Sequence, residues 1–439
     1  MSMRASTPWA CRKISRADPD GSVNNQGPPG DPAALFCFRG ATAPLIRVAM
    51  SASNLPPPAS FSAAAVATVV GFGGTVALVV QAGQALGASP SQIVSMVTAL
   101  CLGIGLPGMV LSWRFRMPVV LAWSTPGAAL LAASTLGLGW SNAIGAFVFA
   151  AVLMVLTGLL PALGRLAQKI PASVASAMLA GVLLPFVLRL FKVVPDEMGL
   201  AVGLLAVFIV ARRLWPAWAL PAVLVVAFGV LAFRGQIGLP PGTGLFGGLT
   251  PVMPAFDWKV AVSLGLPLFL VTLASQNLPG LVVLRAAGYA PPAHRLIFAT
   301  GLTSLVAAPF GAHGVNLAAI TAALCTGPDA HPDPARRWIV GVIYGGFYVV
   351  VALFAAPLAG LFIAMPPAVL AIITGLALIA ALTGALGAML AKPEEREAAV
   401  LTFAATGSGL ALFGIGAAFW GLVVGFAALA AMRWVRPRA

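Results

Sequence analysis

PFGAHGVNLAAITAAL, residues 309–324, places two glycines, a histidine and an asparagine directly before a short apolar run. The run from Val315 to Leu324 is too short to cross about 30 Å of hydrocarbon, for which roughly 20 helical residues are needed. We therefore expect half a helix that begins near Val315, inside a membrane. Broken helices occur at that depth only where protein or water covers the freed backbone groups.

Two interpretations of this stretch are open. A helix that begins at mid-membrane directs its unpaired N–H groups and its dipole at a negative ligand, as discontinuous transporter helices do. Alternatively, Gly311 and Gly314 only permit close helix packing, and Asn316 is a satisfied polar residue between helices.

The composition identifies the class of protein. Of 439 residues, 60% are hydrophobic and 8% are charged, and the mean hydropathy is +0.99. Soluble domains carry about 25% charged residues, so the chain is a polytopic protein of the lipid bilayer. The net charge of +14 is spread as scattered basic residues between apolar runs. This spread favours topology signals over a nucleic-acid-binding surface.

Several kinds of chemistry have no support in the sequence. The four cysteines (Cys11, Cys37, Cys101 and Cys325) lack metal-ligand spacing, so we predict no metal site. The sequence has no GxxxxGK[ST] nucleotide motif and no intramembrane acid–base pair. We therefore predict no cofactor and no enzymatic activity, and we expect any transport to be secondary.

The chain divides into a tail and two membrane halves. Residues 1–55 are rich in Pro, Gly, Asp and Asn, and they predict a disordered cytoplasmic tail; the natural chain is expected to begin at Met50. Fourteen apolar segments follow. Residues 56–234 hold spans 1–7 and residues 258–439 hold spans 8–14, with the third span at 118–137 and the tenth at 314–326.

The basic residues support this count. With the N-terminus in the cytoplasm, only four of the 25 Lys and Arg residues fall outside: Arg189, Lys192, Arg234 and Lys259. Positive residues accumulate on the cytoplasmic side of membrane proteins. The sequence therefore predicts fourteen crossings and places both termini in the cytoplasm.

An internal repeat relates the two halves. ALGASP at 85–90 matches AAGYAP at 286–291 with an offset of 201, and Pro161, Gly164, Pro171 and Ala172 match Pro357, Gly360, Pro367 and Ala368 with an offset of 196. Because seven is odd, the second half enters the membrane from the opposite side. The result is an inverted repeat, for which a substrate site at the pseudo-twofold axis is expected.

The repeat predicts a partner for the opening stretch in the third span. There PVVLAWSTPGAALL, residues 118–131, runs extended into Ser124-Thr125-Pro126-Gly127. Ser or Thr before Pro is a typical helix start. We expect two short helices, beginning near Thr125 and Val315, that direct their N-termini at each other.

The charged residues limit the possible coupling ions. Every acidic residue lies in a tail, a loop or a span end: Asp18, Asp20, Asp31, Asp196, Glu197, Asp257, Asp329, Asp333, Glu394, Glu395 and Glu397. A buried carboxylate would be the usual proton relay or sodium ligand, so sodium coupling is disfavoured. His313 is the candidate proton carrier; the alternative is that an acidic substrate carries its own proton.

The eighth span adds polar groups to the candidate site. Ser275, Gln276 and Asn277 lie near mid-membrane, just before Pro279-Gly280, where a kink or local unwinding is expected. Neighbours on a helix differ by about 100° in direction, so at least one amide should face a polar cavity, unless both bond neighbouring helices. Trp123, Phe269 and Phe310 could supply aromatic walls, which favours an aromatic anion.

Five motifs together resemble the benzoate/proton symporter family of the BenE type. They are LAWSTPGAALL, IPASVASAMLAG (170–181), PLFLVTLASQNLPG (267–280), AAITAALC (318–325) and AFWGL (418–422). The resemblance extends from about Pro56 to the C-terminus. It implies a relationship in fold to uracil permease and to sulfate-permease-like carriers.

The resemblance implies a core domain of spans 1–4 and 8–11, a gate domain of spans 5–7 and 12–14, and a possible homodimer. It also places the substrate between spans 3 and 10, beside span 8. Val315 and the Ser275–Gln276 region stand where nucleobase permeases carry glutamates. These departures remove negative charge, which favours a carboxylate substrate.

The sequence thus predicts a proton-coupled inner-membrane transporter of benzoate or a similar aromatic carboxylate. Its expected substrate-binding residues are Trp123, Ser124, Thr125, Gly127, Ser275, Gln276, Asn277, Phe310, Gly314, Val315 and Asn316. A carrier of another small anion or a nucleobase is the alternative with the same fold. A passive channel is disfavoured, because no ring of like charges occurs.

Overall fold

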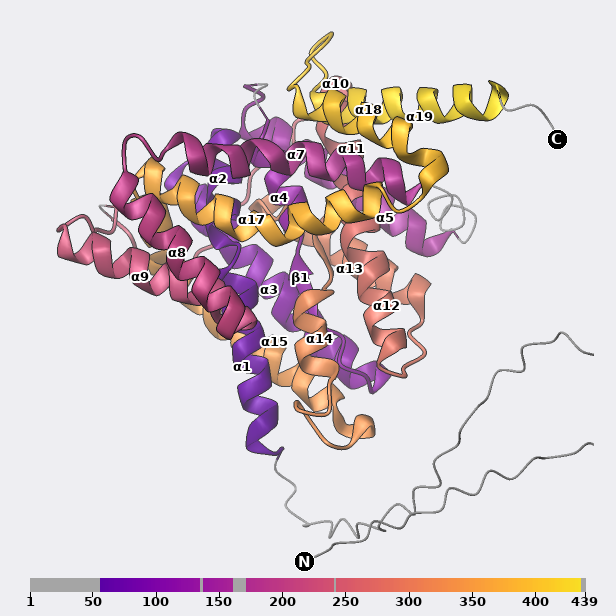
Figure 1. Ribbon diagram of the computed structural model, residues 1–439. Coiled ribbons are helices and arrows are strands. Elements are labelled where there is room, and N and C mark those ends of the chain that lie inside the picture. Colours follow the sequence, from indigo (N-terminus) through magenta and orange to yellow (C-terminus); the bar gives the residue numbers. More distant parts are fainter. Residues whose placement is uncertain (1–55, 135–136, 161–170, 241, 436–439) are drawn as a thin grey trace, which may run out of the picture. The chain divides into compact units, whose positions relative to one another are not determined.

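The computed structural model describes residues 56–134, 137–160, 171–240 and 242–435, without the side chains of residues 433–435 (Figure 1). The predicted tail, residues 1–55, lies outside the described residues, as does the connection at 161–170. The regular secondary structure of the described residues is helical apart from one two-stranded sheet and an isolated bridge between Leu412 and Ile415.

The elements of the first half follow the predicted order. They are α1 (Pro58–Gly73), α2 (Val76–Ala85), α3 (Pro90–Phe115), β1 (Leu121–Trp123), α4 (Thr125–Ala132), α5 (Trp140–Leu159), α7 (Ala172–Lys192), α8 (Met198–Leu214), η1 (Pro216–Trp218) and α9 (Ala219–Phe233). The predicted first span is broken between α1 and α2. At this break Thr75 turns its hydroxyl back to the Gly71 carbonyl at 2.8 Å.

The second half begins with a predicted span that contains two π-helical segments. This span comprises α10 (Trp258–Val260), η2 (Ala261–Gly265), α11 (Leu266–Thr272), η3 (Leu273–Asn277) and α12 (Leu278–Ala286). The wider π-helical turn η3 contains Ser275, Gln276 and Asn277, where the sequence predicts a kink or local unwinding. π-Helical turns interrupt regular helices and are frequent at functional sites.

The remaining elements complete the second half. They are α13 (Ala293–Ala307), η4 (Ala308–Phe310), β2 (Val315–Leu317), α14 (Ile320–Thr326), η5 (Pro334–Arg336), α15 (Trp338–Leu353), α16 (Ala355–Ile363), α17 (Pro367–Met389), η6 (Pro393–Glu395), α18 (Arg396–Gly407) and α19 (Ala417–Val435). The predicted twelfth span, residues 358–390, contains the end of α16 and the whole of α17, because two consecutive prolines, Pro366 and Pro367, interrupt the helix between them.

The two predicted short helices are present, and each follows one of the two strands. Helix α4 has 8 residues and begins at Thr125, after the Ser124 cap. Helix α14 has 7 residues and begins at Ile320, so the predicted start near Val315 is wrong. The reason is that residues 315–317 pair as strand β2 with β1, antiparallel, with Ala122 opposite Asn316.

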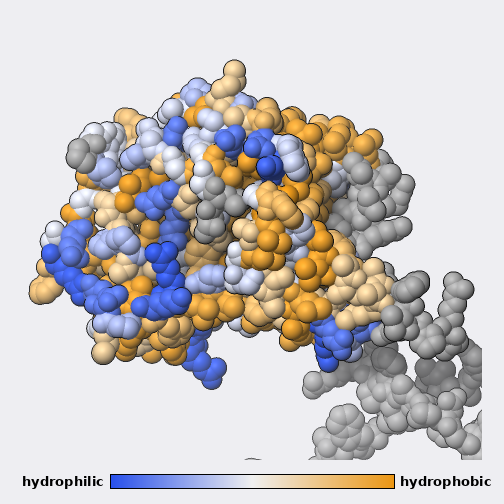
Figure 2. Space-filling view, turned by 90° about the horizontal axis from the view of Figure 1, so that it is seen from above, coloured by the Kyte–Doolittle hydropathy of each residue, from blue (hydrophilic) through white to orange (hydrophobic). Residues whose placement is uncertain are grey.

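Among the described residues, eight helical segments are long and apolar enough to cross a membrane. They are Pro58–Ala85, Pro90–Phe115, Trp140–Leu159, Ala172–Lys192, Pro216–Phe233, Trp258–Ala286, Pro334–Leu353 and Pro367–Met389. The outer surface agrees with this, since Val225 and Phe233 are exposed and apolar residues cover much of the face seen in Figure 2. The chain is therefore an all-α polytopic membrane protein.

Glycines set the closest helix packing. Helix α3 meets α15 where a Cβ on Gly345 would lie 2.6 Å from the Gly105 carbonyl, and α5 meets α13 where a Cβ on Gly301 would lie 2.7 Å from the Val155 nitrogen. Helices α7 and α17 also lie side by side (Figure 1). Small residues allow such close approach where no hydrophobic effect drives helices together.

Gly345→Ala should destabilise the protein, because the added methyl group has no space between α15 and α3. Overpacking a close contact costs about 1–3 kcal/mol. The adjacent Gly346 is the control, since a Cβ there meets nothing within 4 Å. Thermal unfolding in detergent should show a lower midpoint for Gly345→Ala than for the wild type, and an unchanged midpoint for Gly346→Ala. Equal midpoints for the two variants would contradict the α3–α15 contact.

Candidate functional site

Strands β1 and β2 pair where both interrupted segments leave the helical conformation. We call this pair, residues 121–123 and 315–317, the crossing. Beyond the paired residues, the Ser124 N–H donates to the Gly314 carbonyl at 3.2 Å, and the Ala318 N–H donates to the Val120 carbonyl at 2.9 Å. In an antiparallel pair, residues that bond across the strands alternate with residues whose N–H and C=O groups point away. The outward groups of β1 and β2 therefore need other partners.

Side chains from three neighbouring elements supply these partners. The Asn277 Oδ1 accepts from the Leu317 N–H at 3.0 Å, the Ser304 hydroxyl accepts from the Val315 N–H at 2.9 Å, and the Tyr344 hydroxyl donates to the Leu121 carbonyl at 3.0 Å. An unpaired buried backbone group costs about as much as a lost hydrogen bond. These three side chains thus hold the crossing together.

Ser124 and His313 link the start of α4 to the loop before β2. The Ser124 Oγ accepts from the Gly127 N–H at 3.1 Å and lies 2.9 Å from the Thr272 Oγ1, which donates to it. The His313 Nε2 lies 3.0 Å from the Ser124 carbonyl oxygen. Because a carbonyl only accepts, Nε2 carries a hydrogen. The buried Nδ1 has no partner among the described residues.

A small cavity lies beside this histidine. Its volume is about 10 Å³, and its lining includes Thr272, Ser304, His313 and Gly314. This is room for about one water molecule. An aromatic acid does not fit, so the interior of the crossing is not a substrate cavity in this conformation.

The polar residues predicted for the site divide by exposure. Ser124, Asn277 and Asn316 are fully buried, whereas Thr125, Ser275 and Gln276 are partly exposed. The side chains of Ser275 and Gln276 form no hydrogen bond within the described part of the chain. Helix α4 and η3 both contact α7. The partly exposed polar residues thus lie on elements that contact α7, while the buried ones stabilise the crossing.

The remaining predicted residues occupy different surroundings. Trp123 is buried, and its Nε1 donates to the Thr75 hydroxyl at 2.7 Å. Gly127 packs against Leu268, and Val315 packs against Gly103. Phe310 lines a groove between α3 and α13 together with Leu249 and Val306. The structure therefore does not bring Phe310 into the cavity with His313.

Asn316 is buried without a complete set of partners. Its Nδ2 donates to the Leu317 carbonyl at 3.2 Å, but its Oδ1 has no partner among the described residues. The alternative in which Asn316 is a fully satisfied polar residue therefore does not match this conformation. Buried polar atoms left unpaired are uncommon and call for an explanation.

Sequence reasoning missed three residues of the crossing: Thr272, Ser304 and Tyr344. Each is a single hydroxyl-bearing residue within an apolar helix, and such residues commonly bond a neighbouring helix. That signal marks them as candidates, but only the fold shows which strand they contact.

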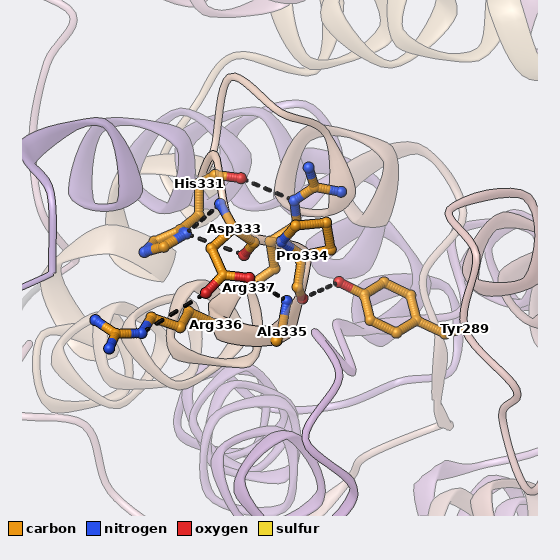
Figure 3. Close-up of polar contacts among 7 residues, drawn as sticks. All are labelled: Tyr289, His331, Asp333, Pro334, Ala335, Arg336 and Arg337. Atoms are coloured by element: carbon orange, nitrogen blue, oxygen red, sulfur yellow. Dashed lines mark hydrogen bonds and ion pairs between the residues drawn. The ribbon is translucent and has the colours of Figure 1, made fainter. Parts of the chain in front are cut away.

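The far end of α14 is fixed by a second polar cluster (Figure 3). The Arg337 Nη1 donates to the carbonyl of Thr326, the last residue of α14, at 2.8 Å. Its Nε donates to the His331 carbonyl, also at 2.8 Å, as Figure 3 shows. The Tyr289 hydroxyl donates to the Pro334 carbonyl at 2.8 Å. Burial raises the pKa of Tyr289 above that of an ordinary phenol, which is itself protonated at neutral pH, so this hydroxyl is a donor. Arg337 thus caps the negative end of the half-helix.

Comparison with known proteins identifies the family. The model of the benzoate membrane transport protein family, BenE, matches residues 54–431. The chain belongs to this family. The resemblance seen in the sequence motifs is thereby confirmed, and the protein is a member of a transporter family, not an enzyme.

Two relatives are similar over nearly their whole length. The chain is 40% identical over 374 residues to the inner membrane protein YdcO of Escherichia coli (strain K12), covering 85% of this chain and 95% of the relative. It is 34% identical over 373 residues to the benzoate membrane transport protein of Acinetobacter baylyi, covering 85% of this chain and 94% of that relative.

Solved structures of anion transporters share the fold of this family member. The transmembrane domain of the cyanobacterial bicarbonate transporter BicA matches with a TM-score of 0.54 at 16% identity, covering 86% of this chain and 95% of that one. SLC26A9 matches with a TM-score of 0.60 at 14% identity, covering 85% and 65%. The predicted relationship to sulfate-permease-like carriers is confirmed at the level of the fold.

Asn277→Leu should lower the stability of this transporter, because it leaves the buried Leu317 N–H without its acceptor. Leaving a buried donor unsatisfied costs about 1–3 kcal/mol. Gln276→Leu is the matched control on the neighbouring residue, which is partly exposed. Thermal unfolding in detergent should distinguish the two variants. The assignment of Asn277 to the crossing would be wrong if both variants unfolded at the wild-type temperature.

Proposed function

We propose that this protein is a secondary active transporter that takes up benzoate or a similar aromatic carboxylate, together with a proton, across the inner membrane. Membership of the benzoate membrane transport family carries this proposal. The partly exposed polar groups of Thr125, Ser275 and Gln276 support it, because they offer hydrogen-bond donors to a carboxylate without a fixed negative charge beside it.

We infer a fourteen-span inverted repeat with boundaries at residues 56–234 and 258–439. The eight long segments are joined by four shorter helices, α8, α13, α18 and α19, and by the two interrupted segments β1–α4 and β2–α14. The packing supports the repeat: α3 pairs with α15 as α13 pairs with α5, so equivalent spans exchange partners. Both termini lie in the cytoplasm, in keeping with the distribution of basic residues.

The substrate carboxylate binds on the side of the crossing that faces α7. The first turn of α4 supplies the positive end of a helix dipole and the N–H group of Thr125, because Pro126 has no N–H and the Gly127 N–H bonds the Ser124 Oγ. Thr125 lies in that turn, and Ser275 and Gln276 approach from η3. Trp123 stiffens the strand behind this surface through its bond to Thr75. The 10 Å³ cavity inside the crossing is too small for an aromatic ring, so the ring occupies the boundary between the core and gate domains.

Transport then requires the two domains to separate and close around this boundary. The crossing belongs to the core domain, with α1 to α5 and α10 to α15, and α7 and α17 form the adjoining face of the gate domain. Movement of one domain against the other would expose the substrate first on one side and then on the other. A homodimer joined through the gate domains would hold that part of each subunit still.

The proton has two candidate carriers. His313 has an unpartnered buried Nδ1 beside a cavity the size of one water molecule, which would give a proton access to the ring. The substrate carboxylate could instead carry the proton itself. The described residues at the crossing include no carboxylate, so sodium coupling lacks its usual ligand.

Proteoliposomes with an imposed inward proton gradient should accumulate radiolabelled benzoate, and a protonophore should abolish the accumulation. Gln276→Leu should weaken benzoate affinity by roughly tenfold, the loss of about one hydrogen bond to a charged group, without lowering the unfolding temperature. Excess unlabelled benzoate should compete, whereas uracil should not. Uptake of radiolabelled uracil that excess benzoate does not inhibit would instead support the nucleobase carrier.

His313→Gln should separate the two routes for the proton. The glutamine amide can still donate to the Ser124 carbonyl but cannot carry a proton. We expect benzoate exchange at equilibrium to persist and accumulation driven by the proton gradient to be lost. His294→Gln is the control, because His294 is exposed. Accumulation that survives in His313→Gln would assign the proton to the substrate.

A further inference from the structure

A second cavity lies away from the crossing, between α4, α7, η2, α18 and α19. Its volume is about 370 Å³, within the range of small-molecule binding sites. The last turn of α4 reaches it at Leu130 and Ala132. Because α4 has 8 residues and rises 1.5 Å per residue, this cavity lies about 12 Å from the crossing. We call it the Arg189 cavity.

Arg189 is the charged residue in its lining. Its side chain is exposed at the cavity, and it forms no ion pair with any described residue. An arginine near the end of α7 also interacts favourably with the helix dipole. That role does not distinguish it from Lys192, which lies in the same last turn but does not line the cavity.

Two further features of the wall favour an anion beside Arg189. The start of α19 lines the cavity at Ala417, Ala418 and the preceding Gly416, and the N–H groups of the first turn have no partner within the helix. Ser263 also lines it; this side chain is 3% exposed, and its hydroxyl has no partner among the described residues. Helix α19 contacts both α7 and η2, so these donors belong to adjoining parts of one wall.

Apart from the polar residues Ser134 and Thr406, the rest of the lining is apolar. Leu130, Val182, Phe186 and Leu264 present hydrocarbon surface next to the donors. The carbonyl end of α4 also lines the cavity and disfavours negative charge next to it. An amphipathic anion would therefore place its charge at Arg189 and α19 and its apolar part toward Leu130 and Phe186.

We propose that the Arg189 cavity is a second binding site for an aromatic carboxylate, which holds the substrate on its way to or from the crossing. The identity of the anion rests on the proposed function. The carboxylate accepts hydrogen bonds from the Arg189 guanidinium, the Ser263 hydroxyl and the first turn of α19. Arginine binds a carboxylate with two parallel hydrogen bonds, which gives both affinity and orientation.

A cysteine at Ala411 reports occupancy of this cavity directly. Ala411 lines the cavity and is exposed, whereas the native Cys101 and Cys325 are buried. Cys11 and Cys37 are replaced by serine. Benzoate should slow the reaction of Ala411→Cys with an uncharged maleimide, and benzamide, which has the same shape without the charge, should not.

Arg189→Gln should raise the benzoate concentration for half-protection at least about tenfold, as expected for the loss of a charge-assisted pair. Lys192→Gln should leave it within about twofold. Protection should persist in Gln276→Leu, which weakens the crossing site instead. Three results would overturn the proposal. Benzoate could protect Arg189→Gln and Lys192→Gln equally, benzamide could protect as well as benzoate does, or the maleimide could fail to react with Ala411→Cys.

The same variants separate this proposal from the proposed function. Benzoate uptake by the wild type without protection at Ala411→Cys would leave benzoate transport standing and remove the second site. Protection that depends on Arg189, without any benzoate uptake, would support the second site and contradict benzoate transport.

Discussion

The rest of this structure depends on the backbone hydrogen bonding of the two interrupted segments, β1–α4 and β2–α14. Two apolar segments stop being helical in the buried interior, and each leaves N–H and C=O groups there without helical partners. The strands β1 and β2 satisfy one another on their facing sides. Asn277, Ser304 and Tyr344 satisfy the sides that face away, and Ser124 caps α4. Each of these side chains comes from a different element, so the crossing fixes α4, η3, α13 and α15 relative to one another.

This constraint explains why the polar residues divide into two groups. The residues that complete the backbone bonds are fully buried and have little freedom to bind a substrate. The side chains of Thr125, Ser275 and Gln276 do not bond the strand backbone. They are partly exposed, on elements that contact α7. A rigid crossing with free polar groups on one side suits a carrier, because the binding surface keeps its geometry while the facing domain moves.

The sequence predicted those parts of the fold that have local signals. Ser124-Thr125-Pro126 marks the start of α4 correctly, because cap and first-turn residues act within a few positions. The start of α14 was misplaced, since Ala319 at its cap has no side-chain bond and the extended conformation of Val315–Leu317 depends on pairing with a strand almost 200 residues away. Gln276 and Asn277 are adjacent in sequence, yet only the fold shows that Asn277 holds β2 and Gln276 does not. Ser304 and Tyr344 have no motif around them, and their role follows from packing alone.

The central claim is that an aromatic carboxylate binds against the first turn of α4 and the η3 turn, on the α7 side of a crossing that does not open. A structure of the protein determined with bound benzoate tests it most directly. The account predicts density for the carboxylate within hydrogen-bonding distance of Thr125 or Gln276, with the β1–β2 pairing unchanged. A carboxylate inserted between β1 and β2 with their pairing broken, or benzoate bound with no contact to α4 or η3, would contradict it.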